Sequence, residues 1–146
     1  IPEITMVFPD TLNNENGNFP LTIHIKNVGQ NQFFIKGISF AIGTFSEEKL
    51  MSMEKIKLEP FEIEKNIILQ AKDDFFDSVK IRENKKWPLS EKIQFTVRAV
   101  IQNDIGQMFL RNRCDIYSKQ SDGSYKTDGL CSYLNSISMD EKSPSL

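Results

Sequence analysis

Histidine and cysteine are scarce in this chain, which holds one histidine, His24, and two cysteines, Cys114 and Cys131. These three side chains are fewer than the four ligands of a structural zinc site, and the cysteines are too far apart for a Cys-x-x-Cys redox motif. The sequence also lacks a Gly-x-Ser-x-Gly nucleophile elbow and a glycine-rich phosphate loop. We therefore expect no metal site, no cofactor and no catalytic residues.

Positive charge is not in excess either, because 18 Lys and Arg residues stand against 20 Asp and Glu residues. The densest basic cluster is Lys85-Lys86, whereas proteins that bind nucleic acid gather many basic side chains against phosphates. We therefore expect no nucleic acid among the partners. The sequence contains no apolar run of about 18 residues, so we expect no membrane-spanning helix within it.

The length of 146 residues suits one ordinary domain, which can bury a core without metals. Hydrophobic residues make up 39% of the chain and include eleven phenylalanines. The stretch 136–146 has few large apolar residues. We therefore predict one domain over residues 1–135, followed by a polar tail over residues 136–146.

Short segments of alternating polar and apolar residues, separated by turn residues, dominate the chain and indicate β-strands. The clearest are residues 21–25 and residues 93–101. Thr96 and Arg98 fall on the polar phase of the second segment, so we expect them to be more exposed than their neighbours. The residues predicted to be buried are Ile23, Ile25, Phe95, Val97 and Ile101.

Turn signals place the connections between these strands. Residues 27–31 predict a turn that leads into the second arm of a hairpin over residues 33–42, with Gly37 as a candidate bulge. Residues 46–49 resemble a short helix start, and residues 73–76 suit either a helical turn or an extended edge segment. The expected fold class is all-β, an antiparallel two-sheet sandwich of about seven to eight strands with one or two short helical turns.

Several of these segments resemble those of bacterial immunoglobulin-like and fibronectin-III-like domains. The resemblance rests on residues 21–29 with 33–42, on 58–60 with 67–69, and on the hairpin that begins at 93–101. It covers roughly residues 20–117 and implies a role in adhesion, scaffolding or binding. The chain departs from antibody domains because it lacks their Cys…Trp…Cys spacing.

The two cysteines are predicted to form one disulfide, because the turn-rich segment between Cys114 and Cys131 allows a short closed loop. Two free buried cysteines are the alternative. Disulfides persist in oxidising compartments, so the prediction favours an extracytoplasmic location: periplasmic, secreted or part of a membrane-anchored ectodomain. We expect such an anchor, if present, upstream of Ile1.

Aromatic side chains are the main candidates for partner contact. Trp87 lies in a loop beside Pro88, where an indole either anchors an interaction or covers the end of the sandwich. Phe75 and Phe76 are further candidates, as are Tyr125 and Tyr133.

Two acid-rich loops offer the remaining chemistry. One contains Asp10 and the other Asp73, Asp74 and Asp77, but neither follows the ligand ladder of an EF-hand. A hydrolase would need two facing carboxylates, for which Glu59 or Glu62 would have to serve as partner.

The sequence therefore favours a non-enzymatic extracytoplasmic module that mediates protein–protein or ligand interaction. A small carboxylate-dependent hydrolase and a subunit of a larger envelope complex are the alternatives.

Overall fold

The computed structural model describes residues 2–46, 49–58, 67–82 and 91–131, and for residues 44–46 and 49–58 it describes the backbone alone. These residues form ten β-strands and no helix. The strands are β1 (Ile4–Val7), β2 (Thr11–Leu12), β3 (Asn18–Asn27), β4 (Phe33–Ser46), β5 (Lys49–Leu58), β6 (Ile67–Leu69), β7 (Asp74–Arg82), β8 (Lys92–Asn103), β9 (Met108–Lys119) and β10 (Tyr125–Leu130). The predicted boundary at residue 135 and the polar tail lie outside the described residues and stay predictions.

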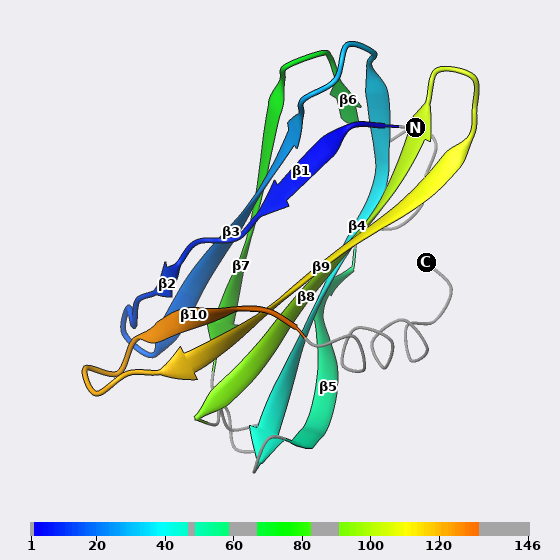
Figure 1. Ribbon diagram of the computed structural model, residues 1–146. Coiled ribbons are helices and arrows are strands. Elements are labelled where there is room, and N and C mark those ends of the chain that lie inside the picture. Colours follow the sequence, from blue (N-terminus) through cyan, green and yellow to red (C-terminus); the bar gives the residue numbers. More distant parts are fainter. Residues whose placement is uncertain (1, 47–48, 59–66, 83–90, 132–146) are drawn as a thin grey trace.

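The strands form two antiparallel sheets that pack as a sandwich. The smaller sheet has the order β1-β3-β7, and the larger has the order β2-β10-β9-β8-β4-β5, with β6 also paired to β4. Figure 1 shows β1, β3 and β7 running together beside the layer that contains β4, β5, β8 and β9. The predicted all-β sandwich is confirmed, and the ten described strands exceed the predicted seven to eight.

The core lies between the sheets and contains the residues that the alternating pattern selected. Ile23 and Ile25 from β3 are fully buried, as are Phe95, Val97 and Ile101 from β8. The ring of Phe95 packs edge-on against Phe8 at 5.0 Å between centroids and lies 5.6 Å from Phe40. The prediction of these five buried residues is confirmed.

The expected exposure of Thr96 and Arg98 was wrong, because they are only 1% and 7% exposed. Strand β8 lies in the middle of the larger sheet, and both of its faces are buried along most of its length. Its polar side chains therefore find protein partners in place of water. Thr96 Oγ1 donates to Cys114 Sγ at 3.3 Å, and Arg98 Nε donates to Asn112 Oδ1 at 3.2 Å.

The predicted hairpin of residues 21–42 was also wrong, although the turn between its arms occurs. Strand β3 belongs to the smaller sheet and β4 to the larger, so the chain crosses between sheets at residues 28–32. Core burial decides this, because both strands turn an apolar face inward from opposite sheets. The predicted bulge at Gly37 is confirmed by a register shift between Ile35 and Gly37 against β8.

The predicted helix start at residues 46–49 was wrong as well. Ser46 pairs with Lys49, and the β4–β5 ladder continues from there to the pair of Ser39 with Leu58. A helix cap contributes about 0.5–2 kcal/mol, and here the long antiparallel ladder prevails over it. The alternative left open for residues 73–76 is settled as extended, since β7 begins at Asp74 on an edge of the smaller sheet.

The predicted disulfide between Cys114 and Cys131 is confirmed. Their Cα atoms are 5.3 Å apart, and the backbone amide of Cys131 donates to the carbonyl of Cys114 at 2.9 Å. Cys114 lies on β9, and Cys131 follows β10 directly. The bridge therefore ties the end of β10 to the strand beside it.

Removing the ring of Phe95 should destabilise the sandwich strongly. We expect Phe95→Ala to lower the free energy of unfolding by about 3–5 kcal/mol, because it leaves a cavity between Phe8 and Phe40. Urea titration followed by far-UV circular dichroism measures the change. A loss below about 1 kcal/mol would contradict the packing described here.

Removing the disulfide should lower stability by a comparable amount. The double variant Cys114→Ala/Cys131→Ala opens a loop whose ends are 17 residues apart and should lose about 3 kcal/mol. Thiol alkylation and mass spectrometry of the wild-type protein, purified without reductant, should find no modified cysteine. Two alkylated cysteines in that protein would show that the bridge does not form.

Candidate functional site

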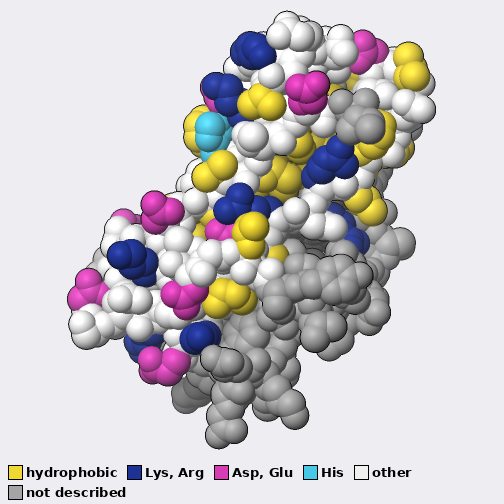
Figure 2. Space-filling view, in the orientation of Figure 1, with side chains coloured by type: hydrophobic (Ala, Val, Ile, Leu, Met, Phe, Trp, Pro, Cys, Tyr) yellow, Lys and Arg dark blue, Asp and Glu magenta, His cyan; other side chains and the backbone are white. Residues whose placement is uncertain are grey.

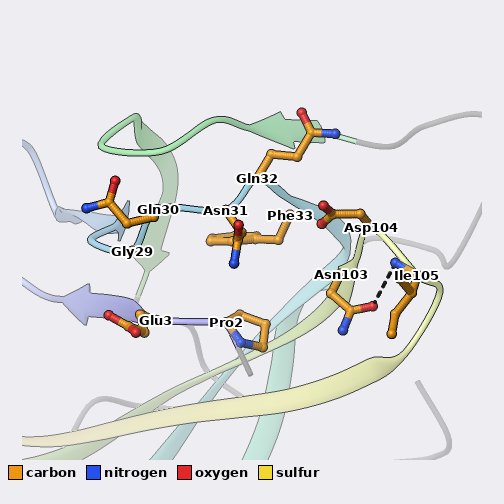
Figure 3. Close-up of a pocket in the computed structure, with 10 residues that line it drawn as sticks. All are labelled: Pro2, Glu3, Gly29, Gln30, Asn31, Gln32, Phe33, Asn103, Asp104 and Ile105. Carbon is orange, nitrogen blue, oxygen red and sulfur yellow. Dashed lines mark hydrogen bonds between the residues drawn. The ribbon is translucent and has the colours of Figure 1, made fainter.

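A cleft lies at the end of the sandwich where three segments far apart in the sequence meet. Pro2 and Glu3 come from the start of the chain, residues 29–33 from the β3–β4 crossover and the first residue of β4, and residues 103–105 from the end of β8 and the turn that follows it. Its volume is about 230 Å³. Figure 3 shows Pro2 across from Phe33 and Asn31, with Asp104 at the opposite rim from Glu3. Loops held by a rigid scaffold are the usual carriers of binding sites.

The buried side chain of Asn27 shapes the crossover side of the cleft. Its amide nitrogen donates to the carbonyls of Asn31 and Leu69 at 2.8 and 3.1 Å, and its amide oxygen accepts from the backbone of Gly29 at 3.0 Å. The backbone of Asn27 also bonds to the turn before β7, through Asp73 and Lys72. One residue thus fixes the crossover, β6 and the start of β7 together.

The start of the chain is drawn close to this crossover. The amide of Val28 donates to the carbonyl of Glu3 at 2.9 Å. A Cβ atom at Gly29 would lie 3.1 Å from the Cβ of Glu3, so glycine permits the close approach of the two segments. This contact places Glu3 at one rim of the cleft.

The β8–β9 turn is held by the side chain of Asn103. Its amide oxygen accepts from the backbone of Ile105 and Gln107 at 3.2 and 2.8 Å, and its amide nitrogen donates to the Gln107 side chain at 2.9 Å. Gly106 closes the turn with a φ of 90°, which glycine adopts without strain. The turn leaves Ile105 80% exposed beside Asp104.

A polar row on β9 anchors the segment that leads out of β1. Arg113 forms a two-pronged ion pair with Asp115, at 2.6 and 3.2 Å, and donates a third hydrogen bond to the carbonyl of Met6 at 2.8 Å. The hydroxyl of Tyr117 donates to the carbonyl of Pro9 at 2.7 Å. Desolvation by burial, reinforced by the nearby Asp115 carboxylate, raises the pKa of Tyr117 well above its usual value. These contacts fix the N-terminal strand to the larger sheet.

Polar groups around the cleft fall into two sets. The side chains of Asn27 and Asn103 hydrogen-bond to backbone groups of the segments around the cleft. Five other polar side chains line the cleft and make no hydrogen bond or ion pair within the described part of the chain: Glu3, Gln30, Asn31, Gln32 and Asp104. Phe33, only 1% exposed, lies at the base of the cleft. The cleft therefore combines an apolar base with polar groups that are available to a ligand.

The residues proposed from the sequence for partner contact lie elsewhere. Phe75 packs partly buried against the core, whereas Phe76 is 61% exposed and stacks on His24 at 4.5 Å. Tyr125 is buried, 1% exposed, and packs edge-on against Phe19, so the expectation that it contacts a partner was wrong. Trp87 and Tyr133 lie outside the described residues, and contact through Trp87, Phe75 or Phe76 stays a prediction.

The carboxylates of the second acid-rich loop engage local partners. The carboxylate of Asp73 accepts from the amide of Gln70 at 3.1 Å, that of Asp74 lies 2.7 Å from His24 Nε2, and that of Asp77 accepts from the amide of Ser78 at 2.9 Å. The structure thus places these three carboxylates in separate contacts. Glu59 and Glu62, proposed as partners for a hydrolytic pair, lie outside the described residues.

Charges of both signs are mixed on the visible face of the molecule. Figure 2 shows basic and acidic side chains interspersed over its described part. Within the ranges that the structure describes, no three His, Cys, Asp or Glu residues gather as a metal site would require. The same ranges contain no helix with the length and apolarity needed to cross a membrane.

Solved structures share the sandwich at low sequence identity. The putative ApaA protein from Bordetella pertussis aligns with a TM-score of 0.58 at 14% identity, over 79% of this chain and 92% of that one. The structural genomics target SoR45 aligns with a TM-score of 0.54 at 11% identity, over 77% and 84% of the two chains. No family model and no curated protein matches the chain. The structural likenesses establish the fold alone.

The free energy of unfolding should fall at high pH because the hydroxyl of Tyr117 is buried. An unfolded tyrosine ionises near pH 10, whereas the folded protein retains the Tyr117 proton to higher pH. The stabilising contribution is thus complete below about pH 10 and is lost as pH rises beyond it, by about 1.4 kcal/mol per unit. We expect the decline to be shallower in Tyr117→Phe, measured by urea titrations between about pH 9 and pH 11. Equal slopes in both proteins would contradict the buried tyrosine.

Proposed function

We propose that this chain is a non-enzymatic, extracytoplasmic binding module of immunoglobulin-like type, which contacts a protein partner through the cleft described above. The observation that carries the proposal is that some polar side chains at this end of the sandwich hold the backbone, whereas others make no hydrogen bond within the described part of the chain. Asn27 and Asn103 hold the backbone rigid, while five neighbouring polar side chains remain available. A pre-organised site of this kind loses little conformational entropy on binding.

The disulfide and the two antiparallel sheets support the remaining parts of the proposal. A Cys114–Cys131 bridge suits an oxidising compartment. The arrangement of sheets and the likeness to other compact sandwiches are consistent with an immunoglobulin-like architecture. Such a sandwich presents loops at its ends, where sequence changes alter recognition without disturbing the core.

Site-specific photo-cross-linking in the cells that make this protein tests the proposal. A benzophenone amino acid replaces Ile105, which is 80% exposed at the rim of the cleft. The matched control carries it at Ser121, an exposed residue of the β9–β10 turn, which lies at the opposite end of β9 from the cleft. We expect irradiation to give a discrete protein adduct from position 105 and none from position 121.

The adduct is detected by immunoblot and identified by mass spectrometry. Its yield should fall when unlabelled protein with the native cleft is co-expressed, because the two compete for the same partner. Absence of an adduct from position 105, or equal adducts from both positions, would contradict the proposed function.

A further inference from the structure

Among the residues that the structure describes, the lining of the cleft includes carboxylates and no positive side chain. Its two ionisable lining residues are Glu3 and Asp104, both carboxylates. The neighbouring β6–β7 turn adds Asp73 and Lys72, so the described residues of the lining and of this turn hold three carboxylates and one ammonium group. The Lys72 ammonium donates to the carbonyl of Val28 at 2.7 Å. The lining carboxylates are therefore available to an incoming cation.

The size of the cleft limits what it can receive. Sites for drug-sized molecules and cofactors usually span about 300–1,000 Å³, and this cleft has about 230 Å³. It therefore suits one side chain presented by a larger partner.

The burial of Phe33 at the base of the cleft favours a basic side chain over a sugar as the ligand. Sugar rings usually stack on an exposed aromatic face, but the ring of Phe33 is 1% exposed and presents no such face. The accessible apolar side chains of the lining are instead those of Pro2 and Ile105. Apolar side chains of this kind accommodate the aliphatic stem of lysine or arginine, whose charged head remains near water.

We propose that the cleft receives a single lysine or arginine side chain of a protein partner. The stem lies against these apolar side chains, and the carboxylates of Glu3 and Asp104 flank the charged head from opposite rims. The amide oxygen of Asn31 accepts a further hydrogen bond from that head. This inference rests on the proposed function and specifies what the cleft recognises.

Titration with small probes, followed by ¹H–¹⁵N correlation spectra, tests the charge requirement. The probe is Nα-acetyl-lysine methylamide, and the control is Nα-acetyl-norleucine methylamide, which keeps the stem and lacks the charge. We expect the lysine probe to bind in the millimolar range and to shift the amide signals of Asn31, Gln32 and Asp104. Higher salt should weaken the binding, because it screens exposed charges.

Two matched variants separate charge from structure. Glu3→Gln/Asp104→Asn keeps the shape of both rims and should weaken the lysine probe by about tenfold. Glu91→Gln removes an exposed carboxylate next to the start of β8, away from the cleft, and should leave the affinity unchanged. Unchanged signal dispersion in both variants shows that the fold is retained.

Three outcomes would overturn the proposal: equal shifts with the norleucine probe, no shift with the lysine probe, or equal affinity for the neutralised variant. Shifts of the same signals with neutral methyl glycosides, and none with lysine, would assign the cleft to sugars and overturn it too. The failure of this inference is distinguishable from failure of the proposed function. If the cross-link from position 105 persists in Glu3→Gln/Asp104→Asn, the proposed binding function stands, and the proposal that the cleft recognises a basic side chain is overturned.

Discussion

The hydrogen bonds of the buried Asn27 side chain fix the structure of this end of the sandwich. This side chain lies where the chain leaves the smaller sheet and enters the larger, and it bonds to the crossover and to β6 at once. A buried amide left without a partner costs about 1–3 kcal/mol, so these bonds resist rearrangement. The crossover therefore keeps one conformation, which fixes the side of the cleft that it forms.

A second polar constraint is a partly buried ion pair on β9. Asp115 is 3% exposed, and its charge is tolerated because Arg113 pairs with it in a two-pronged arrangement. The same guanidinium reaches the carbonyl of Met6, so the pair also fixes the N-terminal strand. Glu3 directly precedes that strand, so the partly buried Arg113–Asp115 pair and the Asn27 amide together position one rim of the cleft.

The core was predictable where one face of a strand meets water and the other meets the opposite sheet. Ile23 and Ile25 follow that pattern, and the sequence located both. Thr96 and Arg98 did not, because a central strand can bury its polar face once neighbours such as Cys114 and Asn112 supply partners. The alternating pattern shows which face of a strand is apolar. It does not show whether the polar face is exposed to solvent.

The cleft was missed for a related reason. Asn27 and Asn31 fall in the predicted turn over residues 27–31, and Asn103 and Asp104 are residue types equally common in turns, so residue type alone gives the members of each pair the same local role. In the structure, the side chain of the first member of each pair holds the backbone, and the side chain of the second makes no hydrogen bond within the described part of the chain. That difference arises only when residues from the crossover, the β8–β9 turn and the chain start meet. The tertiary arrangement decides which polar side chains are already hydrogen-bonded to the protein and which can still bond to a ligand. Residue type alone does not give this distinction.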